Sequence, residues 1–158
     1  MGAQRADRPT SAALSALAGI TGREWLFVEE RDVAPFADPY SNADGFFTPS
    51  AVIAPASVEE VQAVVRIANE HGLKLWPISR GKNLGYGGAA PVLANSVTLD
   101  LGRMNRILEL DERLGYCVVE PGVGFFDLFD KIREEKLDLW MSVPGNAWGS
   151  VIGNALDR

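Results

Sequence analysis

The residues best suited to chemistry lie in one glycine-rich stretch, where four of the 16 glycines fall between Gly81 and Gly88. Glycine has no Cβ, so such a stretch can turn several backbone amides toward one anion and let it approach closely. Polar side chains in the same stretch add donors: Ser79, Arg80, Lys82 and Asn83. The pattern favours a phosphate-binding loop, and a tight turn between two strands is the alternative.

Two common phosphate-binding motifs do not fit this stretch. Residues 85–90 match the G-x-G-x-x-A spacing, but that motif opens a helix, and here Pro91 and a strand-like segment follow. A Walker loop needs a glycine five residues before Gly-Lys and a Ser or Thr after it, and this chain has Trp76 and Asn83 there. A cradle between two strands therefore remains.

The sequence has few residues that could form a disulfide, a metal site or a catalytic triad. Cys117 is the only cysteine and His71 the only histidine, which excludes an internal disulfide or a thiolate cluster and fits a reducing compartment. His71 stands where a helix is expected to end, where a cation is favourable. We expect no metal site and no Ser-His-Asp triad.

Charge and hydropathy exclude further classes. The 158 residues carry a formal net charge of −6, which argues against a nucleic-acid partner. No stretch approaches the about 18 consecutive apolar residues of a spanning helix, and the N-terminus lacks the apolar run of a signal peptide. We expect a cytoplasmic protein with no membrane partner.

Several elements must position the glycine-rich stretch. Ser57 and Glu60 form a capping box before a helix with Val58, Val61, Val64, Val65 and Ala68 on one face, and Gly72 is placed to end it. Further helices are predicted from Ser11 through Leu17 and over 125–136. Short strands are predicted at 73–78, 96–100, 107–110, 115–120 and 137–141.

The remaining segments complete the predicted organisation. Four prolines interrupt residues 33–55, which predicts a loop along a surface. Trp76, Trp140 and Trp148 are expected in the core or in the wall of a site. Alternating strands and helices predict a layered α+β or α/β fold.

Residues 47–158 resemble the FAD-binding, PCMH-type domain of the vanillyl-alcohol oxidase and p-cresol methylhydroxylase flavoprotein family. The matching segments are 48–52 with 58–61, 77–88, 119–123 and 148–154. Residues 85–91, Gly-Tyr-Gly-Gly-Ala-Ala-Pro, look like the version found in members acting on para-substituted phenols. The fold implied is α+β, with a strand-loop-strand phosphate cradle and flanking helices.

The resemblance implies FAD as the cofactor and assigns roles residue by residue. The pyrophosphate would be wrapped by Ser79, Arg80, Gly81, Lys82, Asn83, Leu84, Gly85 and Gly88. A turn beside the cofactor would hold Pro121 and Gly122. The flavin and ribityl region would be lined by Pro144, Gly149, Ser150, Gly153 and Asn154. Tyr86 matches a tyrosine that helps bind the substrate phenolate, and its alternative is a packed tyrosine.

The implied reaction is hydride transfer to flavin N5 from the benzylic carbon of a 4-alkylphenol or 4-hydroxybenzyl alcohol. Oxygen or an electron-transfer protein would then reoxidise the flavin. Gly145 departs from the Asp that aromatic-alcohol oxidases of the family usually carry, which leaves general-base help open. The alternatives are an oxidase of another alcohol or a hydroxy acid on the same fold, or a non-catalytic flavin-binding module.

The resemblance also implies a division of the chain. We expect an N-terminal helix and surface arm over residues 1–46 and the N-terminal part of the FAD domain over residues 47–158. Family members continue with the rest of that domain and a substrate cap, so this chain alone is expected to be inactive. The complete protein is expected to be a homo-oligomer.

Overall fold

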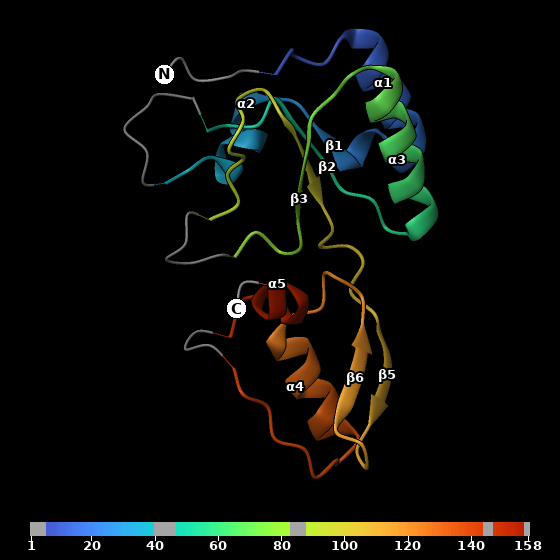
Figure 1. Ribbon diagram of the computed structural model, residues 1–158, viewed down its shortest axis with the longest axis vertical. Helices are drawn as coiled ribbons and strands as arrows, with labels where there is room; N and C mark the ends of the chain where they lie inside the picture. The colour runs from blue at the N-terminus through green and yellow to red at the C-terminus, as the bar shows by residue number, and fades with distance from the viewer. Residues whose placement is uncertain (1–5, 40–46, 83–87, 144–146, 157–158) are drawn as a thin grey trace.

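The structure, a computed structural model, describes residues 6–39, 47–82, 88–143 and 147–156. Figure 1 shows two parts, an upper one built on a four-stranded sheet and a lower one built on a two-stranded hairpin. Helices cover each sheet, which agrees with the predicted α+β fold. The junction of the two parts is where the predicted site residues meet.

The four-stranded sheet has the order β1-β2-β4-β3. Its strands are β1 (Leu26–Phe27), β2 (Ala51–Ile53), β4 (Val97–Asp100) and β3 (Leu75–Ile78). Strands β2, β4 and β3 are mutually parallel, whereas β1 runs antiparallel to β2. The carboxyl ends of the three parallel strands therefore lie at one edge of the sheet.

Two helices pack side by side against this sheet, α1 (Ser11–Thr21) and α3 (Val58–Glu70) (Figure 1). They form an apolar core with the sheet, and its buried hydrophobic members are Leu17, Ala51, Ile53, Val64, Val97 and Leu99. Burying such side chains is the main favourable contribution to folding. The core holds the sheet edge in a fixed place.

Helix α3 begins and ends as its sequence predicts. The Ser57 hydroxyl accepts the Glu60 amide at 3.2 Å, while the Glu60 carboxylate accepts the Ala56 amide at 2.7 Å. Gly72 follows the helix with φ of 64°. The buried stripe is narrower than predicted, however, because Val58 and Val65 are exposed.

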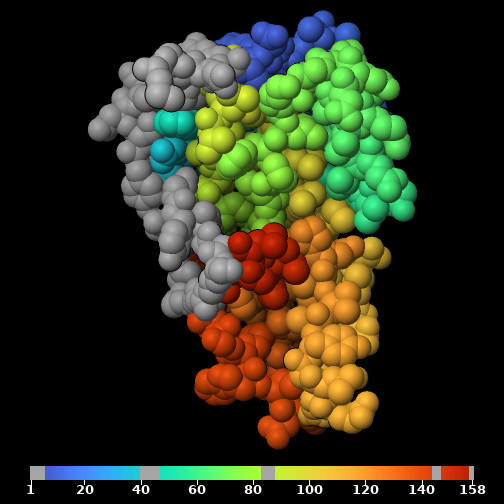
Figure 2. All heavy atoms as spheres, viewed as in Figure 1, coloured from blue at the N-terminus to red at the C-terminus, as the bar shows by residue number. Residues whose placement is uncertain are grey.

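The lower part contains the antiparallel strands β5 (Ile107–Asp111) and β6 (Tyr116–Val119), with helix α4 (Phe125–Glu134) beside them (Figure 1). Helix α4 buries Phe125, Leu128 and Ile132, whereas Phe129 is exposed. The short helix α5 (Val151–Leu156) lies where the two parts meet, as Figures 1 and 2 show.

Several predictions of local structure were wrong. The predicted loop over 33–55 contains β2, whose three residues are all buried. A strand this short between two prolines has no detectable periodicity. Residues 137–141 form no strand, and helix α5 was not predicted. Four further short elements were also missed, namely β1, η1 (Arg23–Trp25), α2 (Glu30–Val33) and η2 (Ala34–Phe36).

The three tryptophans expected in the core or in the wall of a site do not lie in the core, and a position in the wall of a site stays a prediction. Trp140 is 95% exposed and Trp148 is 61% exposed, while Trp76 is partly buried on β3. Without a strand at 137–141, no sheet buries Trp140.

The segments before residue 47 share the upper core, since Leu17 of α1 is fully buried there and β1 joins the sheet. The division of the chain at residue 47 stays a prediction. Among the described residues, no helix is long and apolar enough to cross a membrane.

Candidate functional site

The site begins at the edge where β3 and β4 end. Ile78 pairs with Asp100, and the Leu101 amide donates to the Ile78 carbonyl at 2.9 Å. Ser79 and Gly102 therefore leave the sheet next to each other. Ligands of open α/β sheets commonly bind at such an edge, outside the carboxyl ends of the strands.

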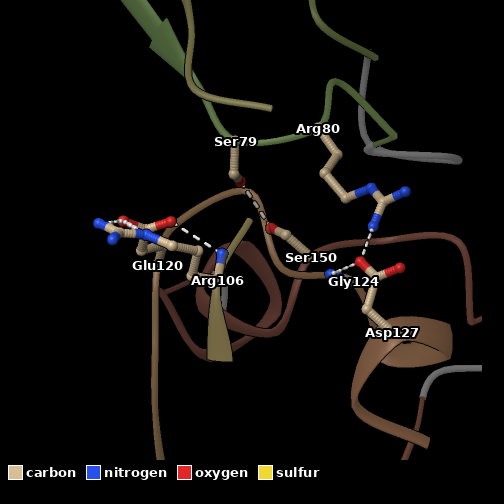
Figure 3. Close-up of polar contacts among 7 residues, drawn as sticks. All are labelled: Ser79, Arg80, Arg106, Glu120, Gly124, Asp127 and Ser150. Carbon is tan, nitrogen blue, oxygen red and sulfur yellow. Dashed lines mark hydrogen bonds and ion pairs between the residues drawn. The ribbon is translucent and has the colours of Figure 1, made fainter. Parts of the chain in front are cut away.

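A pair of serine hydroxyls joins this edge to the start of α5 (Figure 3). The Oγ atoms of Ser79 and Ser150 are 2.6 Å apart, and Ser150 is only 5% exposed. The Ser150 hydroxyl also accepts the Gly153 amide at 2.9 Å. Two residues 71 positions apart in the sequence are thus held together at the junction.

An ion pair makes a second connection across the junction. The Arg80 guanidinium lies 2.5 Å from Asp127 Oδ2, and the same oxygen accepts the Gly124 amide at 2.8 Å (Figure 3). Neither Asp127 nor Gly124 was predicted as a site residue. The sequence signal that could have identified Asp127 is its place in the first turn of an amphipathic helix. There its carboxylate can accept a hydrogen bond from a backbone amide that has no partner within the helix.

Glycine is required where backbone segments meet at this junction. A Cβ on Gly122 would lie 2.6 to 2.7 Å from the carbonyl oxygens of Leu101, Gly102 and Met104. The Gly122 amide donates to the Met104 carbonyl at 2.8 Å. The turn at Pro121 and Gly122 therefore packs directly beneath the sheet edge.

The glycine-rich stretch itself leaves β3 through Gly81, whose φ is 63°, a conformation that side chains disfavour. Gly88, with φ of 70°, lies at the far end of the stretch. Lys82 is exposed. At α5, a Cβ on Gly153 would lie 2.5 Å from the Ser150 hydroxyl and 3.0 Å from the Ser79 hydroxyl.

The structure brings together several predicted residues, Ser79 and Arg80 with Gly122, Ser150 and Gly153. Asn154 is also close, since its amide donates to the Ser150 carbonyl at 3.1 Å. A Cβ on Gly149 would have no described atom within 4 Å. The other predictions fall outside the described residues, namely Asn83, Leu84, Gly85, Tyr86 and Pro144.

Two carboxylates near the site, Glu120 and Asp100, have shifted pKa values. Glu120, which is buried, accepts hydrogen bonds from the Arg106 side chain at 2.6 and 3.0 Å. That pairing holds the pKa of Glu120 below its ordinary value. Burial raises the pKa of Asp100, although the Gly102 amide and the charge of Lys82 oppose the rise. The Glu120 pair fixes the end of β6 just before the turn at Gly122.

The donors at this junction suit an anion. Backbone amides without obstructing side chains, two serine hydroxyls and the cations of Arg80 and Lys82 are the groups that bind phosphates. Among the described residues, no cluster of His, Cys, Asp or Glu could hold a metal ion. The junction therefore carries the donor types of nucleotide-phosphate-binding proteins, and these suit the diphosphate of a dinucleotide such as FAD.

Comparison with known proteins places the chain within this class. Residues 49–158 match the family model described as an FAD binding domain, so the chain belongs to that family. The predicted family and its cofactor, FAD, are confirmed. The PCMH-type fold is confirmed by p-cresol methylhydroxylase, a solved structure with 34% identity and a TM-score of 0.90 over 98% of this chain and 31% of that one. The 4-ethylphenol oxidase from Gulosibacter chungangensis is also similar, with 41% identity and a TM-score of 0.90. The match covers 97% of this chain and 30% of that one.

Two curated relatives are similar at comparable identity. The 4-cresol dehydrogenase (hydroxylating) flavoprotein subunit of Pseudomonas putida is 39% identical over 150 residues, which cover 92% of this chain and 28% of that protein. The 1'-carboxy-chondrochloren decarboxylase of Chondromyces crocatus is 40% identical over 152 residues, covering 96% of this chain and 28% of that protein. The chain thus spans less than a third of the length of these relatives.

The close packing at Gly122 yields a test of the junction. Gly122→Ala should destabilise the fold by about 1–3 kcal/mol, because a backbone segment must move to admit the new methyl group. Gly149→Ala is the matched control, since its methyl group has open space among the described residues. Urea unfolding of both variants measures the difference. Equal stability of the two would show that Gly122 is not closely packed.

The Glu120 pair yields a test with pH. Because the folded-state pKa of Glu120 is lowered, its stabilising contribution is present above the ordinary value of 4.5 and is lost as the pH falls through the lower folded value. We expect Glu120→Gln and Arg106→Gln each to make the acid-side fall of the melting temperature shallower. Melting curves between neutral and acidic pH measure this. Parallel curves for wild type and both variants would contradict it.

Proposed function

We propose that this chain forms the N-terminal part of the FAD-binding domain of an oxidoreductase that acts on para-substituted phenols. The observation that carries the proposal is the convergence of Ser79 and Arg80 with Ser150 and Gly153 at one sheet edge. The similarity to a 4-cresol dehydrogenase subunit and a 4-ethylphenol oxidase supports the substrate class.

In this proposal the diphosphate of FAD is held at the junction between the two parts. The residues that would bind it are Ser79, Arg80, Gly81, Lys82, Asn83, Leu84, Gly85 and Gly88. Pro121 and Gly122 would form the turn beside it. The flavin and ribityl groups would lie along Pro144, Gly149, Ser150, Gly153 and Asn154. Amides, hydroxyls and two cations then offset the phosphate charges.

When bound, FAD supplies the acceptor for a hydride from the benzylic carbon of the substrate. The chain's own contribution is to bind and orient the cofactor and to favour the ionised phenol. We assign the latter to Tyr86, whose hydroxyl could donate to the phenolate oxygen and so favour its negative charge. Gly145 offers no carboxylate, so the proposal gives this position no proton-transfer role.

A second candidate reaction is removal of a carboxyl group from a related aromatic substrate. It is favoured by the 40% identity to 1'-carboxy-chondrochloren decarboxylase, which lies between the 39% and 41% identities to the 4-cresol dehydrogenase subunit and the 4-ethylphenol oxidase. Oxidation of a hydroxy acid on the same fold is a further alternative. These reactions differ in substrate, so direct assays distinguish them.

The direct test uses the purified full-length protein. We expect a flavin absorption band that remains with the protein, bleaching of that band on addition of 4-cresol or 4-ethylphenol, and no bleaching with glycolate. Retention of the flavin in an acid precipitate would indicate a covalent link. A flavoprotein inert to para-substituted phenols but active on a hydroxy acid or a carboxylated aromatic would overturn the proposed substrate class.

A matched pair of glycine variants tests where the cofactor binds. Gly81→Val should weaken FAD binding by about tenfold, equivalent to about 1.4 kcal/mol, because valine strains a backbone with φ of 63° beside the diphosphate. Gly115→Val imposes similar strain, with φ of 67°, in the turn between β5 and β6. Fluorescence titration of the apoprotein with FAD measures both. An equal loss of FAD affinity in the two variants would contradict binding of the diphosphate beside Gly81.

A further inference from the structure

The carboxylate of Asp127 connects the start of helix α4 with the residue that follows Ser79. Its Oδ2 atom accepts the Gly124 amide at 2.8 Å and the Arg80 guanidinium at 2.5 Å (Figure 3). The hydrogen bond from the Gly124 amide fixes the Asp127 carboxylate at the first turn of α4. Arg80 is therefore held at a position set by a helix 47 residues away in the sequence.

This ion pair is not explained by stability alone. The side chains of Arg80 and Asp127 are 35% and 42% exposed, and exposed pairs contribute little to folding. A carboxylate near a phosphate site would also repel the anion unless a cation neutralised it. Pairing with Arg80 removes that repulsion and, at the same time, fixes the direction of the guanidinium.

A fixed guanidinium benefits anion binding. An arginine that is already ordered loses less conformational entropy when it binds a ligand. Its planar group carries five donors, and the Asp127 contact occupies one nitrogen, Nη1. The neighbouring bond between Ser79 and Ser150 holds the backbone of the same segment.

We infer that Asp127 is a positioning residue for the cofactor, holding Arg80 in the orientation that receives the diphosphate. This role rests on the proposed function, in which Arg80 binds FAD. Asp127 itself makes no contact with the cofactor in this account. Its effect on FAD binding must therefore depend on Arg80.

That dependence defines the experiment, a double-mutant cycle in the full-length apoprotein titrated with FAD. Asp127→Asn removes the charge but keeps an oxygen that can accept the Gly124 amide, so the helix start is preserved. We expect this change to raise the Kd for FAD about tenfold in the wild-type background and to have little effect in an Arg80→Gln background. The thermal stability of the apoprotein is measured alongside.

The control is Glu135→Gln, which removes the exposed pair between Glu135 and Lys131 on the same helix. We expect it to leave the Kd for FAD unchanged. If Asp127→Asn weakens FAD binding equally with Arg80 and with Gln at position 80, Asp127 acts only on the helix. If Asp127→Asn leaves the Kd for FAD unchanged, Asp127 has no effect on cofactor binding. Either result would overturn the inference.

Failure of the proposed function is distinguishable, because the wild-type protein would then bind no FAD, or would bind FAD and leave para-substituted phenols unoxidised, whereas the cycle measures only the Kd for FAD. If Asp127→Asn does not fold, Arg80→Lys tests the same claim from the other partner. Lysine keeps the positive charge but lacks the planar guanidinium. We expect a weaker affinity for FAD in this variant, and an unchanged Kd would overturn the inference.

Discussion

The hydrogen bond between the Ser79 and Ser150 hydroxyls is the contact on which the candidate site depends. It joins the carboxyl end of β3 to the start of α5 at 2.6 Å, and these segments belong to different parts of the molecule. Because Ser150 is buried and also accepts the Gly153 amide, its position is tightly determined. Both parts supply residues to the candidate site, Ser79 and Arg80 from the upper part and Ser150 and Gly153 from the lower part.

Close packing of backbone at the junction is the second constraint. Gly122 lies against three carbonyl oxygens, and Gly153 lies against both serine hydroxyls. Side chains at these positions would separate the two parts and move the donors away from one another. The glycines therefore serve to bring backbones together here, in addition to the role of Gly81 in leaving the strand with a positive φ.

Local sequence signals predicted part of the local structure. The capping box at Ser57 and the left-handed Gly72 located α3, and the density of glycines located the stretch after β3. The resemblance to a flavoprotein family then identified FAD. By contrast, β2 has three residues and is too short to show an alternation of apolar and polar residues. Helix α5 has only six residues and follows a glycine-rich loop, so it shows no helical periodicity either. The pairing of Arg80 with Asp127 spans 47 residues and follows only from the tertiary structure.

The central claim is that the cofactor binds where the two parts meet, and amide hydrogen exchange of the full-length protein with and without FAD tests it directly. The account predicts that FAD slows exchange at residues 79–82, 122–124 and 149–153. It predicts no change at residues 112–115, in the turn between β5 and β6. Bound FAD that leaves exchange at the junction unchanged would contradict the account.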